Sequence, residues 1–151
     1  MNLILRKAIM ADVPSLMELV KELALFERAP EKVSNTISQM EQDGFGPEKI
    51  FDAFVVEHQG EVIATAITYY RYSTWRGKCL YLEDLIVKEK HRGNGAGQLL
   101  FDACVKFGKE QNCEYMNWQV LDWNTPAIDF YKRYGTEVDH EWLNCSLALN
   151  V

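Results

Sequence analysis

The stretch from residue 81 to residue 100 constrains the fold of this chain most strongly. An apolar run, Tyr81 to Val87, passes through a basic turn, Lys88 to Arg92, into three alternating glycines. Such glycines let the backbone approach a ligand closely, because a side chain there would occupy the ligand's space. Apolar residues then recur at helical spacing, so the stretch predicts a strand, a glycine-rich turn and a helix. The free N–H groups and positive end of such a helix suit a phosphate.

Three kinds of phosphate-binding loop, and a turn that binds nothing, are possible interpretations of these glycines. A P-loop requires Gly-Lys-Ser or Gly-Lys-Thr at its end, but Gly97 is followed by Gln98 and Leu99. A dinucleotide-binding loop requires a glycine at Gln98 and follows the first strand of its domain, whereas this loop lies mid-chain. The third pattern, Arg-x-x-Gly-x-Gly, is present as Arg92, Gly95 and Gly97. It resembles the acyl-CoA pyrophosphate loop of the GNAT N-acetyltransferases.

Composition indicates an ordinary globular protein. The 151 residues suffice for one domain with a proper core, and we expect a single domain over 1–151. The net charge of -6 argues against nucleic-acid binding and suits a cationic small substrate. No apolar run approaches the roughly 20 residues of a membrane span, and the N-terminus lacks a signal peptide's layout. The scattered cysteines and histidines predict reduced thiols, no metal and a cytoplasmic location.

Hydrophobic periodicity predicts the other elements. We expect a strand at 3–7, a helix capped by Asp12 and ending near 28, a helix at 34–42, a loop at 43–47, strands at 51–57, 62–72 and 78–87, a helix from the glycines to about 111, a strand at 115–120, a helix at 127–134, and one or two closing strands within 137–149. This order predicts an α/β fold with a mixed, mostly antiparallel central sheet and helices on both faces.

A second motif follows the strand predicted at 115–120. Asn124 and Ala127 form Asn-x-x-Ala, and the helix after them carries Phe130-Tyr131 and ends at Gly135. This resembles the second half of the GNAT acyl-CoA N-acyltransferase fold. The chain is similar, more closely, to the spermidine/spermine (diamine) N-acetyltransferases, and most of all to their thialysine N-epsilon-acetyltransferase branch. The matching segments are 21–24, Phe26-Glu27, 43–46, Ser73-Thr74-Trp75, 81–84 and 121–124.

The resemblance implies a mechanism and a set of cofactor contacts. Acetyl-CoA and an amine bind together in a ternary complex, and the amine attacks the thioester directly. The resemblance also implies a homodimer with its substrate site near the interface. The implied acetyl-CoA contacts are the backbone of Leu85, Ile86 and Val87 for the pantetheine arm, Arg92, Gly93, Asn94, Gly95, Ala96, Gly97 and Gln98 for the pyrophosphate, Asn124 and Ala127 for the cofactor arm, and Tyr131 near the sulfur.

The chemistry requires a base and an acid. An alkyl ammonium has a pKa of about 10.4, so a base must take its proton before attack. Glu83 is the candidate, although a solvated carboxylate on a strand face is an alternative interpretation. Asp84 points to the opposite face of a regular strand and can share the site only if a bulge intervenes. A hydroxyl can protonate the CoA thiolate, and Tyr131 fits this role, with Tyr134 as its rival.

Substrate-binding candidates also follow from the resemblance. Phe26 and Glu27 would face the substrate, and Trp75 would wall the amine channel, where an aromatic face suits a cation. A solvated helix-end acid and a surface tryptophan are the ordinary alternatives. Polyamine-acetylating members carry an acid where Ser73 stands and another just before the late tryptophan, with a glycine between. This chain reads Asp139-His140-Glu141-Trp142 there, so any acid is shifted. Fewer acids favour a lysine-like amine or short diamine over spermine.

Three functions therefore remain. The first is N-acetyltransfer from acetyl-CoA to a small lysine-like, diamine or polyamine substrate. The second is acetylation of a protein lysine or N-terminus. It is less favoured, because the compact chain offers little surface to bind a protein substrate. The third is a non-catalytic acyl-CoA-binding module, against which the presence of both Glu83 and Tyr131 argues.

Overall fold

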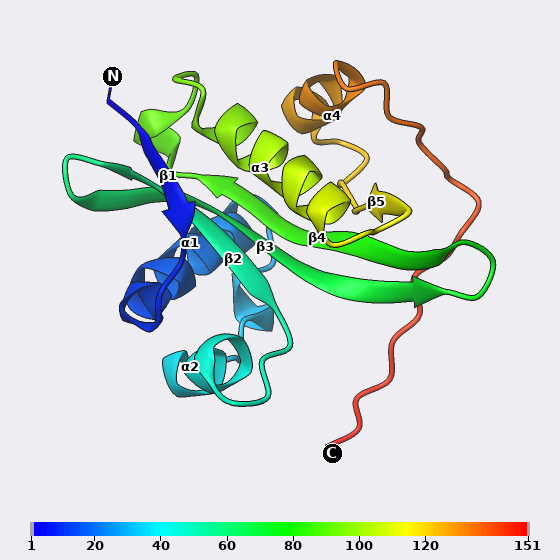
Figure 1. Cartoon of the computed structure of the whole chain (residues 1–151), viewed down its shortest axis with the longest axis horizontal. Helices are drawn as coiled ribbons and strands as arrows, with labels where there is room; N and C mark the ends of the chain where they lie inside the picture. The colour runs from blue at the N-terminus through cyan, green and yellow to red at the C-terminus, as the bar shows by residue number, and fades with distance from the viewer. Residues whose placement is uncertain (1, 151) are drawn as a thin grey trace. The chain divides into compact units, whose positions relative to one another are not determined.

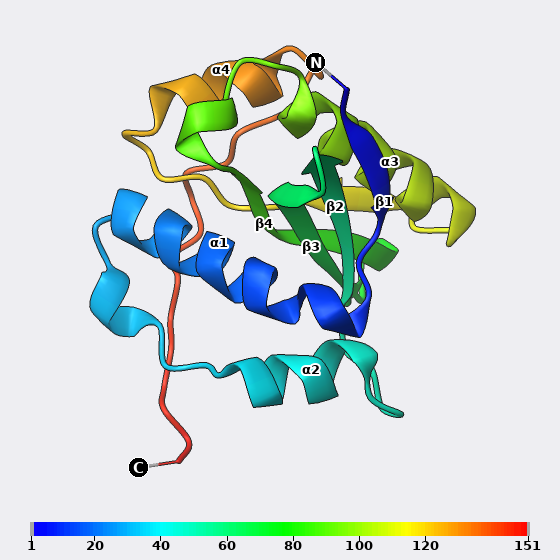
Figure 2. The ribbon, with the colours of Figure 1, turned by 90° about the vertical axis from the view of Figure 1, so that its left-hand side faces the viewer.

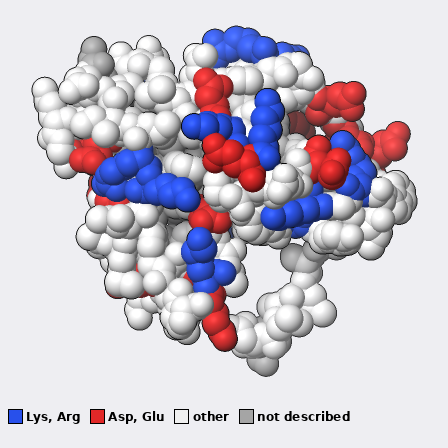
Figure 3. Space-filling view, in the orientation of Figure 1, with Lys and Arg blue, Asp and Glu red and all other residues white. Residues whose placement is uncertain are grey.

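The computed structural model describes residues 2–150. The chain forms two compact units, Met1–Gln119 and Val120–Val151. No helix among the described residues is long and apolar enough to cross a membrane. Acidic and basic side chains lie interspersed on the face of the molecule drawn in Figure 3.

The first unit is built on one sheet whose strands follow the order of the sequence (Figure 1). The first four strands pair antiparallel, and the last pairs parallel to its neighbour. The described strands are β1 (Ile4–Lys7), β2 (Asp52–His58), β3 (Glu61–Ser73), β4 (Gly77–Val87) and β5 (Tyr115–Asn117).

Helices cover both faces of this sheet. α1 (Val13–Phe26) and α2 (Ile37–Phe45) lie on one face and α3 (Ala96–Glu110) lies on the other (Figure 2). The apolar stripe of α1 is fully buried at Leu16 and Leu19, where it packs on the sheet, as helical periodicity predicts. The predicted mixed sheet with helices on both faces is thereby confirmed. Single 3-10 turns, η1 (Met10–Asp12), η2 (Pro30–Lys32) and η3 (Glu89–His91), complete the unit.

The second helix differs from its prediction at both ends. α2 begins at Ile37 because Thr36 caps it, accepting a 3.1 Å hydrogen bond from the Gln39 N–H. The predicted breaker at 43–47 was wrong at its start, since the helix continues to Phe45. Gly44 allows this because it packs against the Phe51 ring, where an added Cβ would come within 2.2 Å.

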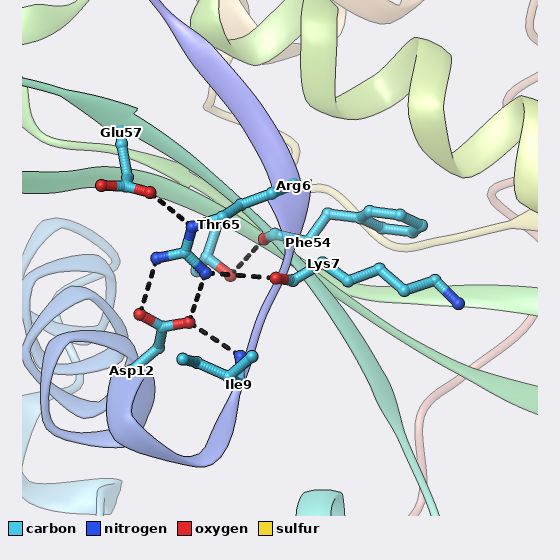
Figure 4. Close-up of polar contacts among 7 residues, drawn as sticks. All are labelled: Arg6, Lys7, Ile9, Asp12, Phe54, Glu57 and Thr65. Atoms are coloured by element: carbon cyan, nitrogen blue, oxygen red, sulfur yellow. Dashed lines mark hydrogen bonds and ion pairs between the residues drawn. The ribbon is translucent and has the colours of Figure 1, made fainter.

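Asp12 precedes α1, but its side chain makes no capping bond. Its carboxylate instead accepts hydrogen bonds of 2.7 and 2.9 Å from Arg6 and one of 2.8 Å from the Ile9 N–H (Figure 4). Arg6 also donates to Glu57 of β2. The hydrogen bonds from Arg6 lower the pKa of Asp12 against the opposing effect of burial. This network ties β1, β2 and the start of α1 together.

The second unit contains α4 (Thr125–Lys132). It begins two residues earlier than predicted, because the Asn124 side chain caps it and Pro126 occupies its first turn. The predicted closing strands were wrong: the described part of 137–149 contains no strand. Alternating apolar residues form a strand only beside a partner edge, and here Trp142 and Leu143 are exposed. The strand predicted at 115–120 is also shorter, ending at Asn117.

Candidate active site

A β-bulge in β4 organises the site. Asp84 pairs with Ile67 of β3, whereas the next pair joins Leu82 to Thr68, so Glu83 has no partner in the β3 ladder. A bulge of this kind breaks the strict alternation of side chains between the two faces of a sheet. Glu83 and Asp84 consequently line the same cavity, although adjacent residues of a regular strand would point apart.

That cavity has a volume of about 700 Å³ and is lined by residues of α1, α2, β2, β3 and β4. Val20, Met40 and Ile67 give it an apolar wall. Its polar lining is mostly acidic or aromatic: Asp43, Asp52, Glu83, Asp84, Tyr69 and Tyr70, together with the single ammonium group of Lys49. Four carboxylates against one ammonium, with aromatic rings beside them, make a site that attracts a cation.

Asp84 has the most perturbed carboxyl group of the site. Burial, together with the nearby charges of Glu83 and Glu27, raises its pKa from 3.8 to about 7. A carboxyl with a pKa near neutrality is well matched to accepting a proton at physiological pH. Strict alternation along the strand predicts that Asp84 points to the face opposite Glu83, and the bulge places it in the cavity instead.

The end of α1 approaches the same place. Glu27 follows the last residue of the helix, burial raises its pKa, and its charge acts on Asp84. Three carboxylates, Glu27, Glu83 and Asp84, therefore share one neighbourhood. The Phe26 ring lies under the Arg92 guanidinium, 5.3 Å from the ring centroid, so the helix end also contacts the glycine-rich turn.

The turn after β4 has the geometry that its glycines predict. Gly93 and Gly95 adopt φ values of 81° and 89°, a region that favours glycine, and α3 begins at Ala96. A Cβ added at either glycine would meet no atom within 4 Å, so the space before the loop is open. Arg92 is held by a 3.1 Å hydrogen bond from its Nε to the Val87 carbonyl oxygen. This geometry fits a phosphate held by the first N–H groups of α3.

The strand before the turn is open on one side. The parallel ladder between β4 and β5 covers only Cys79 to Tyr81 of β4. Among the described residues, β5 therefore does not accompany Leu85, Ile86 and Val87. A strand edge of this kind can pair with the amide groups of an extended ligand. Such an edge is where the resemblance places the pantetheine arm.

Trp75, Asn124, Ala127 and Tyr131 are the remaining predicted residues. Trp75 is in the turn between β3 and β4, is 88% exposed, and is not among the residues lining the cavity. Asn124 accepts a 3.4 Å hydrogen bond from the Ala127 N–H at the start of α4, and Tyr131 lies in the same helix, in the second unit. Residues 2–150 contain no group of three or more His, Cys, Asp or Glu side chains arranged to hold a metal ion.

Comparison with known proteins identifies the family. Residues 15–136 match the model of the Acetyltransferase (GNAT) family. The chain is 32% identical over 141 residues to thialysine N-epsilon-acetyltransferase of Bos taurus, covering 88% of this chain and 83% of that protein. It is 31% identical over 119 residues to an L-ornithine N5-acetyltransferase of Arabidopsis thaliana, covering 78% and 49%. The chain belongs to the GNAT family, and is thus an acyltransferase.

Solved structures confirm the GNAT fold. A tetramutant of the BH1408 protein from Bacillus halodurans superposes with a TM-score of 0.75 at 25% identity, covering 95% of this chain and 99% of that one. The aminoglycoside acetyltransferase meta-AAC0020, from an uncultured soil sample, gives 0.78 at 16% identity, covering 98% and 97%. At 16% identity the second likeness concerns the fold and not the substrate.

Proposed function

We propose that this chain transfers the acetyl group of acetyl-CoA directly to the primary amine of a small lysine-like (thialysine) or diamine/polyamine substrate, in a ternary complex. The observation that carries the proposal is the bulge that turns Glu83 and Asp84 into one acidic cavity. The same strand continues into the open glycine-rich turn. Family members named for thialysine and L-ornithine support an amine of this size.

Within this proposal, Glu83 takes the proton of the substrate ammonium, directly or through a water. Asp84 is the second acceptor, because its pKa of about 7 lets it hold that proton at neutral pH. Phe26 and Glu27 border the substrate from the end of α1. Trp75 contributes to the amine channel in the family pattern, and in this chain it would do so from the exposed β3–β4 turn.

The cofactor supplies the activated acyl group. The backbone of Leu85, Ile86 and Val87 pairs with its pantetheine arm, and the turn from Arg92 to Gln98 binds its pyrophosphate through N–H groups and the guanidinium. Asn124 and Ala127 contact the cofactor arm. Tyr131 gives its phenolic proton to the departing thiolate, whose pKa is about 8.5 in a free thiol. We propose that 1–151 acts as one catalytic domain in a cytoplasmic homodimer, whose size gel filtration with light scattering would report.

Two variants test the assignment of the base. Glu83→Gln and Asp84→Asn keep the shape of the side chain and remove its ability to accept a proton. We expect Glu83→Gln to lower kcat/KM for the amine roughly 10²- to 10⁴-fold, the usual range for an acid–base group. The Kd of CoA, measured by calorimetry, should stay within about twofold, because neither carboxylate belongs to the phosphate loop.

The control is Glu110→Gln, an exposed carboxylate at the far end of α3. It should behave as the wild type in both measurements. If Glu83→Gln and Asp84→Asn both acetylate the amine at the wild-type rate, the bulge does not supply the base and the proposed mechanism is wrong.

A further inference from the structure

We propose that the C-terminal half of α1 couples the binding of acetyl-CoA to the binding of the amine. Phe26, at the end of the helix, transmits the coupling through its contact with Arg92 of the glycine-rich turn. Each substrate then binds more tightly when the other is present. This inference rests on the proposed function and concerns how its two binding sites act on each other.

A single stripe of α1 contacts the turn that leads into the glycines. Glu18, Glu22 and Phe26 follow one another at intervals of four residues, so the helix presents them on one face. Glu18 forms an ion pair with Lys88 at 3.4 Å. Glu22 accepts a 3.0 Å hydrogen bond from the Glu89 N–H. This stripe therefore holds the helix against the turn that precedes the phosphate loop.

The end of the stripe contacts the residue that begins the pyrophosphate turn. The Arg92 guanidinium lies over the Phe26 ring, 5.3 Å from its centroid. Arg92 Nε also donates a 3.1 Å hydrogen bond to the Val87 carbonyl oxygen. A guanidinium keeps further N–H donors for phosphate oxygens when one of them is used in this way. The Arg92 side chain can therefore hold the cofactor and Phe26 at the same time.

The next residue of the chain acts on the amine side. Glu27 directly follows Phe26, and its N–H donates a 2.8 Å hydrogen bond to the Leu23 carbonyl oxygen at the end of the helix. The charge of Glu27 helps to raise the pKa of Asp84, so the two carboxyl groups interact. Because one planar peptide bond joins Phe26 to Glu27, ordering the first residue also restricts the second.

Shared ordering gives the coupling its sign. Phe26 is 40% exposed and Arg92 is exposed, so both side chains lose conformational freedom when a pyrophosphate fixes the guanidinium. The amine then meets an end of α1 that is already ordered, and its binding costs less conformational entropy. Linkage makes the reverse effect equal, so the amine must strengthen the binding of CoA by the same factor.

The test measures the Kd of CoA by calorimetry, with and without saturating thialysine. CoA lacks the acetyl group, so no turnover occurs during the titration. We expect thialysine to lower the Kd of CoA at least about fivefold in the wild type, at the lower end of typical coupling between sites. The converse titration, of thialysine with and without CoA, should give the same factor.

Two variants assign this coupling factor to the aromatic contact. Phe26→Leu keeps an apolar side chain and removes the aromatic face, and it should reduce the factor to about twofold or less. Leu25→Ala is the matched control, because Leu25 is 66% exposed in the same turn of the helix. It should keep the wild-type factor. A general loosening of the helix end changes the two Kd values of both variants alike, whereas loss of the ring contact changes their ratio in Phe26→Leu alone.

Three results would overturn the inference while the proposed acetyltransfer stands. They are a wild-type Kd of CoA that thialysine does not lower, a Phe26→Leu variant with the wild-type factor, and an equal loss of coupling in Leu25→Ala. Absence of acetyl transfer to every amine tested would instead refute the proposed function, and the inference with it. The wild-type comparison requires no variant to fold.

Discussion

Replacing Asp84 by asparagine should stabilise the fold, and should do so more strongly at higher pH. In the folded protein the pKa of Asp84 is raised from 3.8 to about 7 by burial and by Glu83 and Glu27. The folded state therefore binds the Asp84 proton more tightly than the unfolded chain does. Ionising Asp84 lowers stability as pH rises above 3.8, and the loss is complete once pH exceeds about 7. Asparagine does not ionise and avoids this loss.

The size of the effect follows from the shift. About three pKa units at about 1.4 kcal/mol each set an upper limit of roughly 4 kcal/mol. Partial access of solvent to the carboxylate screens its charge and reduces the expected gain to roughly 1–3 kcal/mol at pH 8. For a chain of this size, such a gain raises Tm by about 2–10 °C.

Thermal unfolding followed by circular dichroism, from about pH 5.5 to about pH 8, would measure this effect. The Tm difference between Asp84→Asn and the wild type should grow across the range. Asp129→Asn, an exposed position on α4, is the control and should change Tm little at any pH. A constant Tm difference, or a less stable variant at pH 8, would refute the burial argument.

Three further variants probe other parts of the molecule. Tyr131→Phe should slow thiol release roughly ten- to thousandfold with nearly unchanged CoA affinity, whereas Tyr134→Phe should not; equal rates would remove Tyr131 from the mechanism. Arg6→Ala leaves a nearly buried carboxylate without its guanidinium and should lower the free energy of unfolding by roughly 2–3 kcal/mol in urea denaturation; an unchanged midpoint would contradict this. Gly95→Ala should weaken CoA binding at least about tenfold by calorimetry, whereas Gly60→Ala, with a similar positive φ in a hairpin turn, should weaken only the fold; equal CoA affinities would mean that the loop does not contact the phosphates.

Local patterns predicted the elements they belong to. The strand, glycine turn and helix from Tyr81 to Glu110 follow from apolar spacing and glycine chemistry, which depend on near neighbours in the sequence. The predicted end of α2 was wrong, because the helix continues through Gly44. Gly44 packs against Phe51, a residue of a later segment that local patterns do not take into account. The prediction of closing strands was wrong, because alternating apolar residues suit a strand but do not supply a neighbouring strand for it to pair with.

The candidate site was only partly predictable, because contacts between segments distant in the sequence bring some of its residues together. Glu83 was chosen from its position in β4, but the bulge that adds Asp84 depends on how β4 pairs with Ile67 and Thr68 of β3. Lys49 carries no local motif of its own, since its place in the cavity follows from the fold-back of the loop after α2. The glycine motif after β4 does not by itself indicate this cavity. Only the resemblance to the acetyltransferases connects the two.

The most direct test of the account is to incubate the protein with acetyl-CoA and each of a panel of amines, and to measure both released thiol and acetylated product by mass spectrometry. The panel would contain thialysine, lysine, ornithine, putrescine, spermidine, spermine and a lysine-containing peptide. The account predicts one thiol per acetylated amine, with thialysine or lysine the preferred substrate. Tight acetyl-CoA binding without any acetylated amine would contradict it, and a preference for spermine or the peptide would refute the assignment of a short, lysine-like substrate.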